Sequence, residues 1–251
     1  MVLRAVQGLR VFFTLLCEVI FGQKARRDKM SQNDSYFLSW RLAVEANNVR
    51  PWRTVPLHYS HHLEVYMLGG QYQLDVQLIG EQISVYVSEI TPLPGDGMDA
   101  WVLDVDDTCI SNVNFYKERR FGCDPFDSTG FKAWIKEGAC PAIPAVLALF
   151  KKLIDRGFKV VLLTGRDEER FGKITIDNLH NQGFIGYERL IMRTSAQKGV
   201  SAVSYKSNIR KQLEGEGYRI WGNVGDQWSD LQGDSCGKRT FKLPNPMYCI
   251  A

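Results

Sequence analysis

Residues 100–108 read AWVLDVDDT, an apolar run that ends in three aspartates within four positions. Residues 101–103 are bulky or β-branched and predict a short buried strand. In an open α/β sheet, such a strand delivers the residues that follow it to the crevice at its carboxyl end. Because extended chain alternates with period 2, Asp104 and Asp106 point the same way, so we expect two carboxylates that share a proton or a cation in one pocket.

A plainer interpretation of the same stretch is an Asx turn or a helix cap, for which Asp-Asp-Thr is suitable material. A second apolar run, residues 160–166 or VVLLTGR, favours chemistry instead. It ends in Thr164, Gly165 and Arg166, and a hydroxyl, a permissive backbone and a guanidinium at a strand end can together hold a phosphate.

The last third of the chain adds a cation and a further acidic pair. Lys206 lies in SYKSNIRKQL, and residues 223–230, NVGDQWSD, follow an apolar run and carry Asp226 and Asp230. Taken alone, Lys206 is typical of a solvated lysine, Asp230 of a turn cap, and Thr108 of a helix start. The order in which Lys206, Asp226 and Asp230 follow the earlier acids and Thr164 favours a functional interpretation of these residues.

The order Asp-x-Asp, Thr, Lys and Gly-Asp-x-x-x-Asp resembles the four motifs of the haloacid dehalogenase (HAD) superfamily of phosphohydrolases. The segments DVDDT, LLTGRDE, YKSNIRKQL, GYRIWGNVGDQWSDL and FKLPNPMY resemble, more narrowly, the plant class B acid phosphatases and the vegetative storage proteins. This resemblance extends from about Trp40 to the C-terminus.

The resemblance implies an α/β fold, with a HAD-like Rossmannoid parallel sheet, helices on both faces, a small helical cap insert and an N-terminal helical extension. It implies a Mg²⁺-dependent acid phosphatase that acts through an aspartyl phosphate, with Asp104 as nucleophile and Asp106 as general acid and base. The implied metal residues are Asp104, Asp106, Asp226 and Asp230. The implied phosphate-binding residues are Thr164, Gly165, Arg166 and Lys206.

Hydrophobic periodicity and turn residues supply the expected elements of this fold. We expect an extension over residues 38–96 and a phosphatase core over residues 97–251, with a cap insert at about 109–144. The expected helices cover residues 39–49, 60–90 with a break at Gly69 and Gly70, 128–136, 142–157, 167–182 and 202–216. The expected strands after the first cover residues 159–163, 189–192, 219–224 and 240–243.

Composition bounds the partners of the protein. The chain has 251 residues, 45% of them apolar, which is enough for one sizeable core. A net charge of +3 from 31 basic and 28 acidic residues gives no field that demands nucleic acid, so a small charged substrate fits better. The family resemblance implies that this substrate is a phosphomonoester. The oligomeric state is left open.

Metal-binding patterns other than the acidic one are weak. The six cysteines show no C-x-x-C spacing, which argues against a zinc site. Cys123 and Cys140 bracket the insert, and we expect a disulfide between them if the chain is secreted. His58, His61 and His62 are interpreted as a polar helix start rather than as metal ligands.

Residues 11–21, VFFTLLCEVIF, follow Arg4 and Arg10 and have the layout of a signal peptide, although Glu18 interrupts the apolar core. The run is too short to span a bilayer core of about 30 Å. Residues 1–25 are therefore either a signal peptide or a disordered N-terminus. The first alternative, which the family resemblance favours, implies a secreted or vacuolar protein, and the second a cytoplasmic one.

Two rivals to an active enzyme share this pattern. A storage or binding protein keeps the fold after losing catalytic residues, usually the nucleophile, but here Asp104 is present. A phosphorylated signalling receiver uses similar acids, yet its acceptor aspartate follows a later strand, and no suitable lone aspartate follows residues 159–163 or 189–192.

Overall fold

The computed structural model describes residues 32–49, 52–92 and 97–250. The chain divides into two compact units, Met1–Trp40 and Arg41–Ala251, and the described part of the first is the beginning of helix α2 (Gln32–Glu45). The predicted signal peptide at residues 1–25 lies outside the described residues. Within the described ranges, no helix combines the length and the apolar character that crossing a membrane requires.

The second unit is organised around a five-stranded parallel sheet with the order β3-β2-β1-β4-β5. The first strand of the chain occupies the centre of the sheet, and all five of its residues are buried, as its apolar sequence requires. The predicted α/β class and parallel sheet are confirmed. The strands are β1 (Asp99–Leu103), β2 (Lys159–Asp167), β3 (Arg189–Arg193), β4 (Arg219–Gly225) and β5 (Arg239–Lys242).

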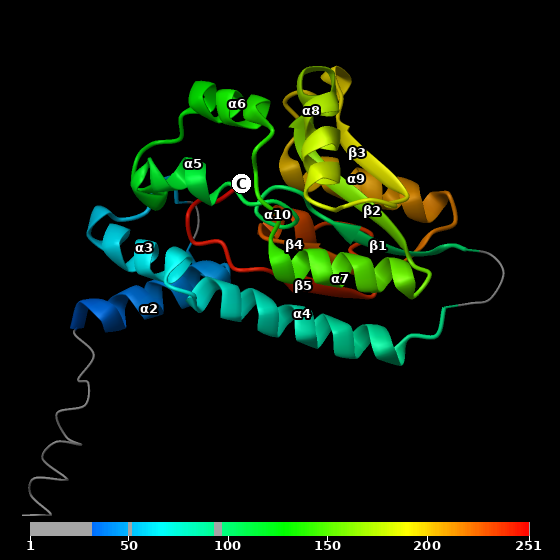
Figure 1. Ribbon diagram of the computed structural model, residues 1–251, viewed down its shortest axis with the longest axis horizontal. Helices are drawn as coiled ribbons and strands as arrows, with labels where there is room; N and C mark the ends of the chain where they lie inside the picture. The colour runs from blue at the N-terminus through cyan, green and yellow to red at the C-terminus, as the bar shows by residue number, and fades with distance from the viewer. Residues whose placement is uncertain (1–31, 50–51, 93–96, 251) are drawn as a thin grey trace, which may run out of the picture. The chain divides into compact units, whose positions relative to one another are not determined.

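Helices cover both faces of this sheet, as predicted (Figure 1). On one face, Val102 of β1 belongs to an apolar cluster with Ile209 and Leu213 of α9 (Ala202–Gly215). On the other, the ring of Trp101 lies 6.0 Å from that of Tyr86 in α4 (Gln71–Glu89), which packs along α7 (Pro144–Asp155). Alternate residues of β1 thus face opposite helical layers, and the carboxyl end of the strand lies between these layers.

The helices before the sheet follow the predicted pattern with one shift. Helix α3 (Ser60–Leu68) and α4 are separated at Gly69 and Gly70, where Gly70 has φ 101°, a conformation that favours glycine. Helix α2 begins at Gln32 and ends at Glu45, whereas the expected helix covered residues 39–49. It ends early because Asn47 adopts a left-handed conformation, φ 61°, that closes the helix. The three histidines lie in η1 (Leu57–Tyr59) and in the first turn of α3.

The insert between β1 and α7 carries α5 (Val113–Lys117), η2 (Arg120–Gly122) and α6 (Ser128–Glu137). The carboxylate of Asp127 caps α6 by accepting hydrogen bonds from two backbone N–H groups of its first turn, and Gly138 ends the helix with φ 62°. The remaining helices are α8 (Glu168–Asn181), η3 (Ser195–Gln197) and the short α10 (Trp228–Leu231).

The predicted disulfide is wrong, because Cys123 and Cys140 are both free thiols. The two sulfurs have different surroundings. Cys123 Sγ lies 3.9 Å from the carbonyl oxygen of Pro56, whereas Cys140 is buried with its Sγ 3.5 Å from Asn112 Oδ1. Strand β2 is also longer than predicted, since it continues through Arg166 to Asp167 with an irregular register against β3.

Candidate active site

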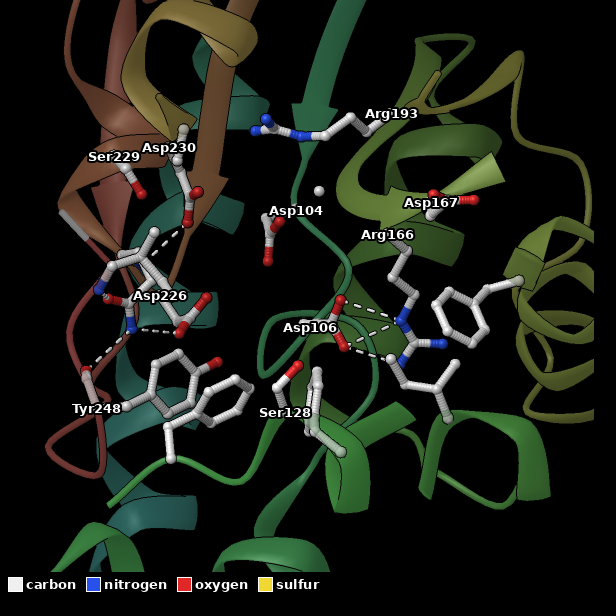
Figure 2. A pocket seen from close by; sticks show the side chains of 18 of the residues that line it. Asp104, Asp106, Ser128, Arg166, Asp167, Arg193, Asp226, Ser229, Asp230 and Tyr248 are labelled. Atoms are coloured by element: carbon white, nitrogen blue, oxygen red, sulfur yellow. Dashed lines mark hydrogen bonds and ion pairs between the residues drawn. The ribbon is translucent and has the colours of Figure 1, made fainter. Parts of the chain in front are cut away.

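A cavity of about 440 Å³ opens where the strands of the second unit end (Figure 2). Asp104 and Asp106 line it directly after β1, and Gly165 and Arg166 line it from the end of β2. Lys206 enters from α9, and Asp226 and Asp230 enter from the segment after β4 and from α10. Parallel strands bring these segments together because their carboxyl ends meet at one edge of the sheet.

Three carboxylates form a tight cluster at the base of the cavity. One oxygen each from Asp104, Asp226 and Asp230 lies within 4.8 Å of the others, and all three residues are buried. Burial and the neighbouring acids raise the pKa of Asp104 well above its usual range, although Lys206 opposes this. The same causes, burial first and then Asp230, raise the pKa of Asp226 to about 6. Like charges held this close favour a bound proton or a bound cation.

Lys206 bridges two members of the cluster. Its Nζ donates to Asp104 Oδ1, and it lies 2.6 Å from Asp230 Oδ1. Burial alone would lower the pKa of Lys206, but the two carboxylates outweigh it and raise this pKa, so the side chain stays charged. The lysine therefore offsets part of the negative charge in the cluster. The other carboxylate oxygen of Asp104, Oδ2, accepts no hydrogen bond from any residue that the structure describes.

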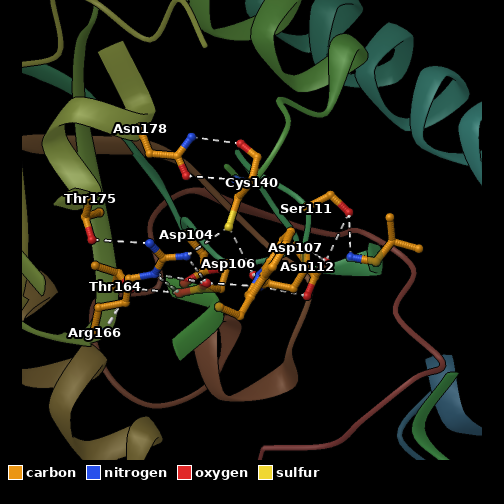
Figure 3. Close-up of polar contacts among 12 residues, drawn as sticks. Asp104, Asp106, Asp107, Ser111, Asn112, Cys140, Thr164, Arg166, Thr175 and Asn178 are labelled. Carbon is orange, nitrogen blue, oxygen red and sulfur yellow. Dashed lines mark hydrogen bonds and ion pairs between the residues drawn. The ribbon is translucent and has the colours of Figure 1, made fainter. Parts of the chain in front are cut away.

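Asp106 is held by a different cation (Figure 3). Arg166 Nε lies 3.1 Å from both carboxylate oxygens of Asp106, and Nη2 lies 2.7 Å from Oδ1. The Arg166 side chain is 2% exposed, and Nη1 donates to Thr175 Oγ1 at 3.2 Å. Burial acts to raise the pKa of Asp106, but Arg166 and the hydrogen bond from Asn112 outweigh it and lower the pKa.

Thr164 differs from its predicted place. Its hydroxyl is fully buried, donates to Asp106 Oδ2 at 3.2 Å and accepts from the backbone N–H of Arg166 at 3.1 Å. Thr164 is not among the residues that line the cavity. Of the four predicted phosphate ligands, Gly165, Arg166 and Lys206 line the cavity, and Arg166 already holds Asp106.

Several supporting residues escaped the sequence analysis. Thr108 Oγ1 lies 3.3 Å from Asp226 Oδ1 and accepts from the backbone N–H of Asp226 at 3.1 Å, so it joins the segments after β1 and β4. Asn245 Nδ2 and Gln227 Nε2 donate to Asp226 Oδ2 at 2.7 and 2.8 Å. All three lie in segments that carry the family resemblance, Thr108 in DVDDT, Gln227 in GYRIWGNVGDQWSDL and Asn245 in FKLPNPMY, but those segments do not indicate which atoms they contact.

A further buried acid, Asp107, ties the insert to the C-terminal segment. Its Oδ1 accepts from the backbone N–H of Asn112 at 2.8 Å, and its Oδ2 accepts from the Tyr248 hydroxyl at 2.8 Å. The Tyr248 ring stacks on that of Tyr116 with centroids 4.8 Å apart, and both line the cavity. No local pattern marks the contact between Asp107 and Tyr248, because these residues are 141 positions apart in the sequence.

The donor set at the base of the cavity fits a hard divalent cation. All three clustered side chains offer carboxylate oxygens, the ligands that Mg²⁺ and Ca²⁺ prefer, and no sulfur or imidazole takes part. Burial, and after it the charge of neighbouring acids such as Asp230, raises the pKa of both Asp104 and Asp226. A cation among these oxygens relieves that repulsion.

Comparison with known proteins agrees with this geometry. Residues 23–251 match the family model described as HAD superfamily, subfamily IIIB (Acid phosphatase). "Acid phosphatase 1" of Solanum lycopersicum is 41% identical over 223 residues, 89% of this chain and 87% of the relative. "Vegetative storage protein 2" of Arabidopsis thaliana is 34% identical over 238 residues, 93% of this chain and 88% of the relative.

The fold has a counterpart among solved structures. The class C acid phosphatase from Bacillus anthracis superposes with a TM-score of 0.61 at 19% identity, covering 74% of this chain and 82% of that one. The sequence resemblance to the HAD phosphatases and to the plant storage proteins is thereby confirmed. The chain belongs to the acid phosphatases of HAD superfamily subfamily IIIB, a family of phosphomonoester hydrolases.

Proposed function

We propose that this protein is a Mg²⁺-dependent acid phosphatase that hydrolyses phosphomonoesters through an aspartyl-phosphate intermediate. One observation carries the proposal. Asp104 and Asp106 line one cavity in different electrostatic surroundings, Asp104 against Lys206 and the acidic cluster, and Asp106 against Arg166. Two carboxylates that share one cavity but have different charged partners are suited to two different roles.

In the first half-reaction, Asp104 attacks the phosphorus atom. Its Oδ1 is held by Lys206, which leaves Oδ2 to form the new P–O bond while the bond to the ester oxygen breaks. Lys206 reduces the repulsion between the attacking carboxylate and the phosphate anion, and it opposes the rise in the pKa of Asp104 that burial causes. Protonated Asp106 gives its proton to the departing alkoxide.

In the second half-reaction, water attacks the phosphorus atom of the aspartyl phosphate. Asp106, now a carboxylate, takes the proton from that water, the bond from Asp104 to phosphorus breaks, and inorganic phosphate leaves. Asn112, Thr164 and Arg166 hold both oxygens of Asp106 in place. Because these donors lower the pKa of Asp106, they favour its carboxylate form, which is the form that the second half-reaction needs.

The metal belongs beside the attacking residue. Asp104 and Asp226, with Asp230 in support, would hold Mg²⁺ through carboxylate oxygens, and the carbonyl of Asp106 is the further ligand that the family motif implies. A bound Mg²⁺ would neutralise negative charge on the phosphoryl oxygens. Gly165 and Lys206 bind those oxygens, while Thr164 and Arg166 act on the phosphate through Asp106.

Two substitutions test the roles of the aspartates. Asp104→Asn removes the attacking charge, so neither intermediate nor product should form. Asp106→Asn should still be phosphorylated by an activated phenyl phosphate, and then accumulate a hydroxylamine-labile phosphate on Asp104, because the second step lacks its base. Asp177→Asn, an exposed carboxylate on α8, serves as the control and should turn over normally.

The metal has its own test. Chelation of divalent cations should abolish turnover, and Asp226→Asn should come close to the same result, with Asp230→Asn milder. Persistent activity in chelator would refute the metal dependence. Phosphate on a residue other than Asp104, or normal turnover by Asp104→Asn, would favour the alternative of a weakly active or inactive storage protein, which the vegetative storage relatives suggest.

We further propose that the chain follows a secretory route. We also propose that the chain consists of an extension at residues 38–96 and a core at 97–251 that carries the cap at 109–144. A relative from Glycine max, 39% identical over 95% of this chain, is named "Stem 31 kDa glycoprotein". This chain has one N-glycosylation sequon, Asn33-Asp34-Ser35, and Asn33 is exposed. Expression in secreting cells, with peptide N-glycosidase treatment and Asn33→Gln as control, tests the route.

A further inference from the structure

The cavity extends beyond the carboxylates, and its outer part is lined by residues that the proposed chemistry does not use. Its volume of about 440 Å³ lies in the range of pockets that enclose whole small ligands, so the leaving group of the ester is bound there too. We call this outer part the leaving-group pocket. It is lined by Phe131, Lys132, Ile135, Arg170, Phe171 and Arg193.

The apolar half of the leaving-group pocket is a built surface. Ile135 of α6 and Phe171 of α8 are buried in one cluster, and Phe131 packs against them. The cap helix is thereby fixed against the core. An aromatic wall of this kind accepts a flat apolar group and excludes water from one side of the pocket.

The other half is positively charged. Lys132, Arg170 and Arg193 come from three different elements, and the one carboxylate among them is Asp167, 3.9 Å from Arg170. In the part of the chain that the structure describes, neither Lys132 nor Arg193 forms an ion pair with a carboxylate. The base of the cavity holds two cations, Arg166 and Lys206, against four carboxylates, Asp104, Asp106, Asp226 and Asp230, so the excess of positive charge is confined to the outer part.

Arg193 is held in a fixed position by uncharged groups, so its positive charge is not paired with a carboxylate. Its Nη1 donates to the carbonyl oxygens of Gln197 at 3.2 Å and Val200 at 2.6 Å, and its guanidinium lies 4.5 Å from the centre of the Tyr205 ring. Its Nε and Nη2 donate to no described residue. In Figure 2 the side chain extends above Asp104, toward the side of the cavity that carries Asp230. A guanidinium held with donors to spare suits a second oxyanion.

We propose that the leaving-group pocket selects phosphomonoesters whose leaving group is a flat apolar ring that carries a further acidic group. The ring lies against Phe131 and Phe171, and the acid is bound by Arg193 with Lys132. This inference rests on the proposed phosphatase function and deepens it, because it names the class of substrate. Neither cation belongs to the motifs that identify the family.

Two matched substrates test the proposal. Phosphate esters of 4-hydroxybenzoate and of 4-hydroxybenzamide have the same shape, but only the first carries a second negative charge. The amide is the better leaving group because it withdraws more electron density. We nevertheless expect kcat/KM to be about tenfold higher for the carboxylate, the effect of one charge-assisted hydrogen bond at a partly exposed site.

Variants assign the preference to the pocket. Arg193→Gln should bring the ratio of the two kcat/KM values close to one, and Lys132→Met should lower it in part. Lys136→Met, an exposed lysine on the same helix that lies outside the cavity, is the control and should keep both values. If Arg193→Gln keeps the wild-type ratio, or lowers both values equally, the assignment is refuted.

The substrate proposal and the phosphatase proposal fail in different ways. Hydrolysis of both esters without preference for the carboxylate would refute the leaving-group pocket and leave the phosphatase intact. If neither ester is hydrolysed, the corresponding benzylphosphonates are compared by calorimetry with wild type and Arg193→Gln. Equal affinity for the acid and the amide would then refute the pocket, and about tenfold tighter binding of the acid would support it without turnover.

Discussion

Removal of the cation that holds Asp106 should destabilise the protein strongly. Arg166→Met keeps the length of the side chain but leaves the Asp106 carboxylate without its charged partner. Loss of one member of a buried pair typically costs about 3–5 kcal/mol. The Asp106 side chain is 20% exposed and keeps hydrogen bonds from Asn112 and Thr164, so we expect the lower end, about 3 kcal/mol at pH 7.

The assay is urea unfolding of metal-free protein, with Asp106→Asn and the double variant completing a mutant cycle. In the Arg166→Met background, Asp106→Asn should recover part of the loss, because it removes the uncompensated charge. We expect a coupling of about 2 kcal/mol. Lys173→Met, which breaks an exposed 2.6 Å ion pair with Asp177, is the control and should cost about 0.5 kcal/mol or less.

The pH dependence of the free energy of unfolding gives the sign of the contribution of this pair. In the wild type the pKa of Asp106 is lowered, so the contribution of the pair is present above the unfolded pKa of about 3.9 and is lost as pH falls through the folded value. The deficit of Arg166→Met should therefore shrink in acid. Equal losses for Arg166→Met and Lys173→Met, or additive effects in the cycle, would refute the idea that this buried pair stabilises the fold.

Three further predictions follow from contacts elsewhere in the fold. Gly222→Ala should cost about 3 kcal/mol in thermal unfolding, because its Cβ would lie 2.0 Å from a buried indole ring, whereas Gly215→Ala, with no atom within 4 Å, should gain up to about 1 kcal/mol. The pKa of Asp226 is raised to about 6, so in metal-free protein this residue contributes stability below about pH 4 that is lost as the pH rises to about 6. The free energy of unfolding should fall by about 3 kcal/mol over this range, and Asp226→Asn should flatten the fall. Alkylation of the native protein should modify Cys123, which is partly exposed, and reach the buried Cys140 only after unfolding; a Cys123–Cys140 bridge found by mass mapping would contradict the structure.

The sequence determined the layout of the core because that information is local. Short apolar runs, and helical stripes bounded by glycine, proline and capping residues, predicted β1 to β5 and most helices of the sheet layers. The spacing of the motifs then placed Asp104, Asp106, Lys206, Asp226 and Asp230 around one crevice, since parallel strands have their carboxyl ends at one edge.

Only the tertiary structure decided which of these groups bond to one another. Arg166 and Asp106 are 60 positions apart, and the continuation of β2 turns the guanidinium onto the carboxylate rather than leaving it free for the phosphate. Asn245 reaches Asp226, and Cys140 packs beside Asn112 instead of pairing with a second thiol. Hydrophobic periodicity specifies the face on which a residue lies, whereas its polar partner depends on how distant segments pack, and no local pattern carries that information.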